Sequence, residues 1–173
     1  MQIFFPKEEA HEIRATILPE VAKKFIDLGI EVSVESGLGD KIYVSDELYK
    51  QSGASICSSS EEGFLGADVV CKINKPTSEE IKLLKKNTIY ISFLDPFNEK
   101  QIVSELAFAN VSSISMELVP RITRAQKMDA LSSQANLAGY AAVIEASRTL
   151  TKSFPMMMTA AGTISPARVF VVG

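Results

Sequence analysis

Apolar stretches alternate with amphipathic stretches along residues 1–117. The apolar stretches are short and rich in β-branched residues, which is typical of strands buried in a parallel sheet. The amphipathic stretches repeat their apolar residues every three or four positions, which is typical of helices. We predict strands over residues 2–6, 30–36, 54–58, 67–73, 88–94 and 111–117, and helices over 18–29, 45–53, 77–87 and 102–110.

The ends of several predicted helices carry recognisable signals. Pro19 suits the first turn of the first helix, and Gly29 suits its end. Capping-box spacing, in which a hydroxyl or amide residue precedes Glu or Gln by three positions, occurs at Thr77/Glu80 and Asn98/Gln101. Six strands separated by helix-length connections predict an α/β fold. We expect a doubly wound, Rossmann-like, mostly parallel sheet with helices on both faces.

The character of the chain changes after Glu117, where a polar segment leads into a long helix predicted over residues 131–150. Residues 153–166 are predicted to form a loop or short helix, and residues 167–173 an apolar strand that ends in glycine. Such a strand is how a dinucleotide-binding unit begins. We therefore expect an N-terminal α/β domain, a linking helix with its loop, and the first strand of a truncated Rossmann domain, over residues 1–128, 129–164 and 165–173.

Composition narrows the function classes. Hydrophobic residues make up 46% of the 173 residues and charged residues 23%, with a formal net charge of -3. Because no basic block occurs, nucleic-acid binding is not expected. No apolar run reaches the roughly 18 residues of a membrane span, and the N-terminus lacks the basic start of a signal peptide. We expect a cytoplasmic or at least intracellular chain that does not insert into a membrane.

Few residues offer familiar catalytic chemistry. Cys57 and Cys71 lie in strand-like segments without metal-ligand spacing, and we interpret them as small buried hydrophobic residues. The single histidine, His11, is expected in a solvent-facing loop. The sequence contains no nucleophile elbow, Walker loop or zinc-protease motif, and we expect no metal site.

The candidate site is the segment RITRAQKMDALSSQANLAGY, residues 121–140. Arg121 offers a planar charged donor, Gln126 donates and accepts, Asp129 accepts, and Ser132 does either. This set suits a planar ring that bears a carboxamide, which needs one donor and one acceptor. A purely structural interpretation is also open, with Asp129 as a helix N-cap and Arg121 in a salt bridge.

This segment closely resembles the signature segment of the NAD-binding component of proton-translocating NAD(P) transhydrogenase. The resemblance extends along the whole chain, through "FFPKE", "EIRATILPEVAKKFIDLGIEVSVESGLGD", "DVVCKINKP" and "SFPMMMTAAGTISPARVFVVG". That family shares its fold with alanine dehydrogenase. Each has a first α/β domain and a Rossmann domain that follows the long helix, so the family's glycine-rich loop would come next.

The resemblance implies particular roles. Arg121, Gln126, Asp129 and Ser132 match the family residues that surround the nicotinamide of NAD(H), and Gln126 would reach toward the NADP(H) of a partner subunit. Tyr140 also matches a family tyrosine and is assigned to cofactor binding. Hydride would pass between NADH and NADP+, coupled to proton translocation by membrane-embedded subunits.

The resemblance also implies partners and a location. We expect a homodimer that associates with NADP(H)-binding and membrane subunits. The chain would lie peripheral to the inner membrane, on the cytoplasmic side or on the matrix side of an organelle. Without the glycine-rich loop, the 173 residues alone are expected to bind NADH weakly and to be inactive.

Two alternatives stay open. An alanine dehydrogenase-like oxidoreductase acting on a small 2-oxo acid would use Arg14, which fits the substrate-binding arginine of those enzymes. Asn74 stands where they carry a lysine, and Asp95 where they carry a catalytic histidine, so no general acid is evident. Arg14 would then pair with a nearby carboxylate. The other alternative is a non-catalytic α/β scaffold.

Overall fold

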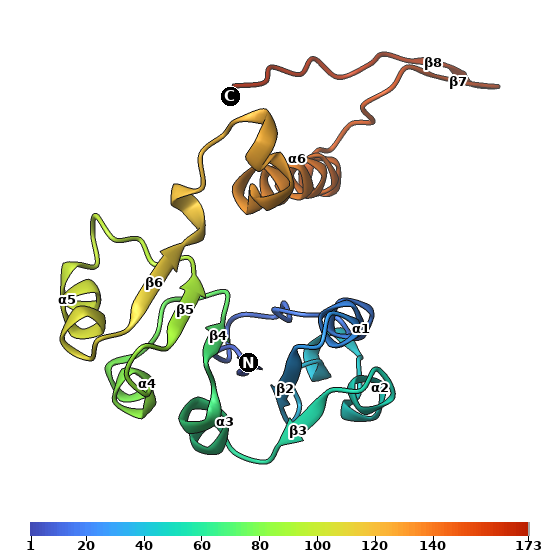
Figure 1. Cartoon of the computed structure of the whole chain (residues 1–173). Helices are drawn as coiled ribbons and strands as arrows, with labels where there is room; N and C mark the ends of the chain where they lie inside the picture. The colour runs from blue at the N-terminus through green and yellow to red at the C-terminus, as the bar shows by residue number, and fades with distance from the viewer. Residues whose placement is uncertain (173) are drawn as a thin grey trace. The chain divides into compact units, whose positions relative to one another are not determined.

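A computed structural model describes residues 1–172 of the chain (Figure 1). The chain divides into two compact units, Met1–Met128 and a second unit that begins at Asp129. The first unit contains the sheet and the hydrophobic core. The second contains one long helix and a short hairpin.

The first unit is built on a six-stranded sheet whose order is β3-β2-β1-β4-β5-β6, with every neighbouring pair parallel. The predicted doubly wound sheet is therefore confirmed, and each of the six predicted strands is present. Their bounds are β1 Gln2–Phe5, β2 Glu31–Glu35, β3 Ser55–Cys57, β4 Val69–Cys71, β5 Ile89–Ser92 and β6 Ser112–Ser115.

Helices cover both faces of this sheet because successive strand residues point to opposite sides. Phe4, Val70 and Tyr90 belong to one core cluster with residues of α3, α4 and α5. Ile3, Phe5 and Val69 belong to the other, with residues of α1 and α2. The helices are α1 Pro19–Asp27, α2 Asp46–Gln51, α3 Ser60–Gly66, α4 Ser78–Leu83 and α5 Lys100–Phe108, and the short 3-10 turn η1 is Asp40–Ile42.

Most predicted helix ends are confirmed. Pro19 occupies the first turn of α1, and Gly29 ends it with a φ of 80°. Its N–H donates to the Ile26 carbonyl at 2.8 Å, while the Ile30 N–H donates to the Phe25 carbonyl at 3.1 Å. These two bonds form a Schellman motif, in which glycine adopts the left-handed conformation without a Cβ penalty. The Thr77/Glu80 capping box at α4 is also present.

The Asn98/Gln101 capping prediction is wrong. Helix α5 begins at Lys100 with Glu99 as its N-cap, and no side chain caps it. Asn98 instead donates through Nδ2 to both carboxylate oxygens of Asp95 at 2.9 Å. Asp95 has a φ of 49°, so the tight turn after β5 uses the amide that the spacing assigned to the helix.

Helix α3 was not predicted. Ser59 caps it by accepting the Glu62 N–H at 3.3 Å. Phe64 packs edge-on against Phe4 of β1, with ring centroids 5.3 Å apart. Gly63 allows this approach, because a Cβ there would lie 2.1 Å from the Phe4 ring. The packing of α3 on β1 compensates for two glycines that make its sequence a poor isolated helix.

The second unit contains α6, Ala130–Thr149, and a two-stranded antiparallel hairpin of β7, Met157–Thr159, and β8, Gly162–Ile164. The long helix is confirmed. The loop or short helix predicted over 153–166 is instead this hairpin, whose turn places Gly162 at a φ of 134°. The strand predicted over 167–173 is absent from residues 167–172, which pair with no strand, and Gly173 lies outside the described residues. A strand requires a neighbour to pair with, and apolar composition alone does not provide one.

Candidate functional site

The polar segment of the sequence lies between β6 and α6. After η2, Met116–Leu118, the chain forms a six-residue 3-10 turn, η3, Thr123–Met128. Ala125 is buried and its N–H donates to the Ile122 carbonyl at 2.9 Å. Its neighbours in η3 are exposed, including Gln126, and Arg121 just before η3 is exposed as well. Local packing therefore anchors the segment at one apolar residue and leaves these polar side chains accessible.

Asp129 is the N-cap of α6. One carboxylate oxygen accepts the Ser132 N–H at 2.9 Å, and the other accepts the Ser132 hydroxyl at 2.6 Å. The Ser133 hydroxyl donates to the Asp129 carbonyl at 3.0 Å, and Asp129 is only 8% exposed. The N-cap interpretation of Asp129 is therefore confirmed. The same contacts fix the orientation of its carboxylate, since two different donors hold the two oxygens.

The structure brings together two of the predicted site residues, Asp129 and Ser132, at the first turn of α6. Arg121 and Gln126 belong to the first unit. Tyr140 lies near the middle of α6 with 71% of its surface exposed. Cofactor binding by these five residues stays a prediction, and their donors and acceptors are of the kinds that a carboxamide-bearing ring requires.

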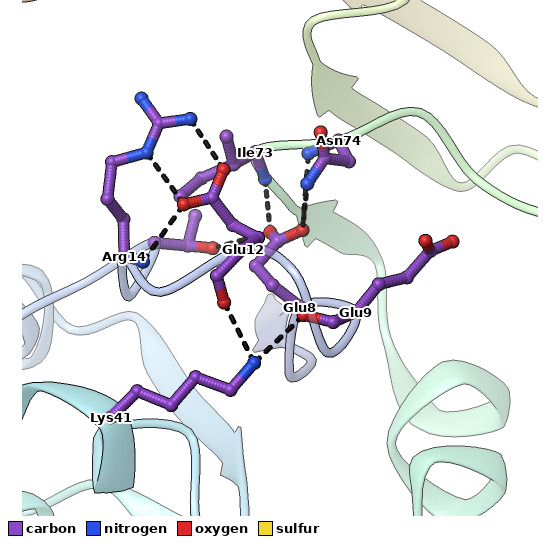
Figure 2. A network of polar contacts seen from close by, with 8 residues as sticks. Glu8, Glu9, Glu12, Arg14, Lys41, Ile73 and Asn74 are labelled. Atoms are coloured by element: carbon purple, nitrogen blue, oxygen red, sulfur yellow. Dashed lines mark hydrogen bonds and ion pairs between the residues drawn. The ribbon is translucent and has the colours of Figure 1, made fainter.

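A second polar cluster lies at the carboxyl ends of the strands (Figure 2). The Glu8 carboxylate, on the loop after β1, accepts hydrogen bonds from the N–H groups of Ile73 and Asn74, on the loop after β4. The Asn74 side chain donates to the same carboxylate at 2.9 Å. Lys41 donates to three backbone carbonyls of residues 9–12, at 2.8 to 3.1 Å. These contacts fasten the loop after β1 to its neighbours.

Arg14 is paired within this cluster, as the structural interpretation expected. Its guanidinium donates to both carboxylate oxygens of Glu12, at 2.8 and 2.6 Å (Figure 2). This bidentate pair lowers the pKa of Glu12 to about 2 and raises that of Arg14. An arginine held in this way is already matched to a carboxylate of its own loop, which disfavours its use for a substrate carboxylate.

We expect the stability contributed by Glu12 to vanish in acid. Its hydrogen bonds with Arg14 lower its pKa from 4.5 to about 2. A carboxyl group whose pKa is depressed by folding stabilises the fold above its unfolded pKa, and this contribution is lost as pH falls through the folded value. The difference in unfolding midpoint between wild type and Glu12→Gln should be constant above about pH 5 and decline to zero toward about pH 2. A difference unchanged across this range would contradict the assignment, and Glu9→Gln is the control.

Neither Asn74 nor Asp95 offers a ready general acid. Asn74 is an amide whose Nδ2 is directed at Glu8. The Asp95 carboxylate accepts from Asn98, and its backbone N–H is bound by the Glu117 carboxylate. Both positions therefore serve loop structure at the edge of the sheet.

The remaining titratable candidates are also structural. Cys57 is buried and Cys71 is partly buried, and both are free thiols. Burial raises the pKa of both, that of Cys71 to about 12, so neither thiol is ionised at neutral pH. His11 is exposed as predicted, 3.5 Å from Glu9. Within residues 1–172, no group of three or more His, Cys, Asp or Glu side chains could hold a metal ion.

The sheet order and the helices on both faces define the first unit as a doubly wound α/β domain of the Rossmann type. The family model "Alanine dehydrogenase/PNT, N-terminal domain" matches residues 4–138. The chain belongs to this family.

The most informative relatives are transhydrogenases. Over its whole length the chain is 43% identical to an NAD(P) transhydrogenase subunit alpha protein of Rhodospirillum rubrum, covering 47% of that protein. The crystal structure of a transhydrogenase from Sinorhizobium meliloti matches 96% of this chain and 50% of its own, with a TM-score of 0.90 and 40% identity. Alanine dehydrogenase of Methanococcus maripaludis is more distant, at 27% identity over the whole chain and 47% of that protein. The chain thus spans about half the length of the relatives it matches.

Sequence reasoning missed the cluster around Glu8, Glu12 and Lys41. A signal was present, because three glutamates follow directly after the first strand, in "PKEEAHE". Their partners on the loop after β4 are distant in sequence, and only the sheet order brings these loops together. Among the described residues, none of the helices is both long and apolar enough to cross a membrane.

Proposed function

We propose that the chain forms the first domain of the NAD(H)-binding component of a proton-translocating NAD(P) transhydrogenase. The observation that carries the proposal is the contrast between two sets of side chains. Arg14, which an alanine dehydrogenase would use for its substrate, is bound to Glu12. Arg121 and Gln126 of the polar segment are exposed, and Asp129 and Ser132 are held in a fixed pair.

In this proposal the residues of the polar segment position a nicotinamide ring. NADH, when bound, supplies the hydride. Asp129 accepts from the carboxamide N–H, with its carboxylate orientation fixed by the N-cap bonds to Ser132. Arg121 donates to the carboxamide oxygen, Ser132 adds a hydrogen bond, Tyr140 contacts the cofactor, and Gln126 extends toward NADP(H) on the partner.

Positioning alone is sufficient chemistry for this reaction. Hydride passes directly between two nicotinamide rings, so no general acid or base is needed. Holding reacting atoms near contact distance lowers the barrier by several kcal/mol, on the order of 7–11 kcal/mol in favourable cases. The absence of a histidine at Asp95 is consistent with this reaction, whereas reduction of a keto acid or imine requires a proton donor.

The proposal extends to the assembly. We place the chain in a homodimer that docks on an NADP(H)-binding subunit and on membrane-embedded subunits that move the proton. The complex holds it at the surface of the inner membrane, on the cytoplasmic or matrix side. The 173 residues alone are expected to be inactive, because the pyrophosphate of a dinucleotide needs a glycine-rich loop at a helix N-terminus.

We expect NADH oxidation to require an NADP+-loaded partner subunit. The chain would be joined to the remaining half of the Rhodospirillum rubrum relative, with which it is 43% identical over the matching half. NADH oxidation is then followed with the NADP+-loaded partner and, separately, with pyruvate and ammonium. Activity only with the partner supports transhydrogenation. Activity with pyruvate and ammonium would assign an alanine dehydrogenase, and activity with neither, while the intact relative is active, would assign a scaffold.

A further inference from the structure

The crevice between β1 and β4 is the position where an open α/β sheet normally binds ligands. These strands are neighbours in the sheet, yet the chain leaves β1 toward β2 and leaves β4 toward β5, on opposite sides. Ligands of such sheets bind at this reversal of strand order, beyond the carboxyl ends of the strands. The residues there are those of Figure 2, and the transhydrogenase proposal gives them no role.

A carboxylate already occupies this crevice. Glu8 Oε1 accepts from the Ile73 N–H at 2.5 Å and from the Thr16 hydroxyl at 3.2 Å. Its Oε2 accepts from the Asn74 N–H at 3.3 Å and from the Asn74 side chain at 2.9 Å. Each oxygen therefore has two donors, and two of the four donors are successive backbone N–H groups. This arrangement is a binding site for a planar anion, in which the anion is a side chain of the protein.

The loop that carries Glu8 is held independently of this side chain. Lys41 Nζ donates to the carbonyls of Glu9 at 2.9 Å, Ala10 at 3.1 Å and Glu12 at 2.8 Å. Arg14 binds Glu12 in the same loop. The donors on the other side belong to the loop after β4 and follow a strand paired on both edges. Loss of the Glu8 carboxylate should therefore leave the site formed.

The same arrangement recurs along this edge of the sheet. Carboxylates of the chain accept backbone N–H groups that follow other strand ends, in the pairs Glu35 with Lys7, Asp46 with Gly37, and Glu117 with Leu94 and Asp95. Backbone N–H groups at such strand ends are the usual donors to phosphate and carboxylate ligands. Here the chain satisfies them with its own negative charges, which also repel a dinucleotide pyrophosphate.

We infer that the crevice between β1 and β4 is a small-carboxylate site that the chain keeps closed with its own Glu8. The Glu8→Ala substitution removes the atoms from Cγ outward, and these correspond to one acetate ion. The variant should bind acetate in the space left by the side chain, between the Ile73 and Asn74 donors and Thr16. The wild-type protein should not bind it, because the site is filled.

Thermal unfolding of the 173-residue chain, followed by far-UV circular dichroism, tests this inference. In sodium chloride we expect the midpoint of Glu8→Ala to lie on the order of 5 °C below wild type. Sodium acetate at the same ionic strength should raise that midpoint, in a saturable manner, by at least half of the loss. Wild type and the matched variant Glu9→Ala, from the same loop, should respond equally to the two salts.

Two further measurements keep the outcome decisive. If Glu8→Ala is unfolded in chloride, recovery of its helical signal on dialysis into acetate replaces the midpoint as the readout. Adding Asn74→Ala to Glu8→Ala should abolish the acetate response, since it removes the Nδ2 donor. An acetate response of Glu8→Ala no larger than that of Glu9→Ala, or a response that survives Asn74→Ala undiminished, overturns the inference.

Discussion

Replacing Glu80 with alanine is expected to lower the free energy of unfolding by about 3 kcal/mol. The Lys72 side chain is only 2% exposed, and its ammonium donates to Glu80 at 2.6 Å. Glu80 also accepts the Thr77 N–H at 2.8 Å as part of the capping box of α4. The substitution therefore leaves a buried cation without a counter-charge and removes half of a helix cap.

Urea denaturation of wild type and variants measures this effect. Glu79→Ala is the matched control, because Glu79 is adjacent on the same helix turn but its ion pair with Lys82 is exposed. Its loss should be below about 1 kcal/mol. The double variant Lys72→Met/Glu80→Gln should recover much of the stability that Glu80→Ala loses, since no unpaired charge remains. Equal losses for Glu79→Ala and Glu80→Ala would mean that Lys72 is solvated once its partner is removed.

The fold could be predicted from sequence because its strands carry their own signal. The stretches around Val69 and Ile89 are apolar on both faces, and the helices between strands show amphipathic periodicity. What escaped prediction depends on contacts distant in sequence. Helix α3 relies on Phe64 and Gly63 packing against Phe4. Its Ser59/Glu62 spacing was nevertheless a capping signal that could have been used.

The same distinction applies to the candidate site. Asp129 and Ser132 are three residues apart, so their N-cap contact follows from local geometry. Glu8 and Asn74 are 66 residues apart, and their contact depends on β1 and β4 being neighbours. Arg14 could be assigned a carboxylate partner from its chemistry. The choice of Glu12 depended on the course of the loop, which the sequence pattern does not specify.

In the chain joined to the remaining half of the Rhodospirillum rubrum relative, we expect Asp129→Asn to slow hydride transfer on the order of 100-fold while leaving the fold intact. This prediction rests on the proposed function. Asparagine is a good N-cap, so its oxygen can still accept the Ser132 N–H that Asp129 accepts at 2.9 Å. The second carboxylate oxygen, which accepts the Ser132 hydroxyl at 2.6 Å, becomes an amide NH2 group. The negative acceptor proposed for the carboxamide is thereby lost.

Gln126→Ala should give a similar loss of rate with no loss of stability, because Gln126 is exposed in η3. Ser133→Ala is the matched control, since it removes a bond to the Asp129 carbonyl at the same helix end but lies outside the proposed ring contacts. Turnover per folded molecule and the unfolding midpoint are measured for each variant. A rate unchanged in Asp129→Asn and Gln126→Ala would leave Asp129 as a helix cap alone. A rate that falls only where the midpoint falls would show that the polar segment acts through folding rather than through the nicotinamide.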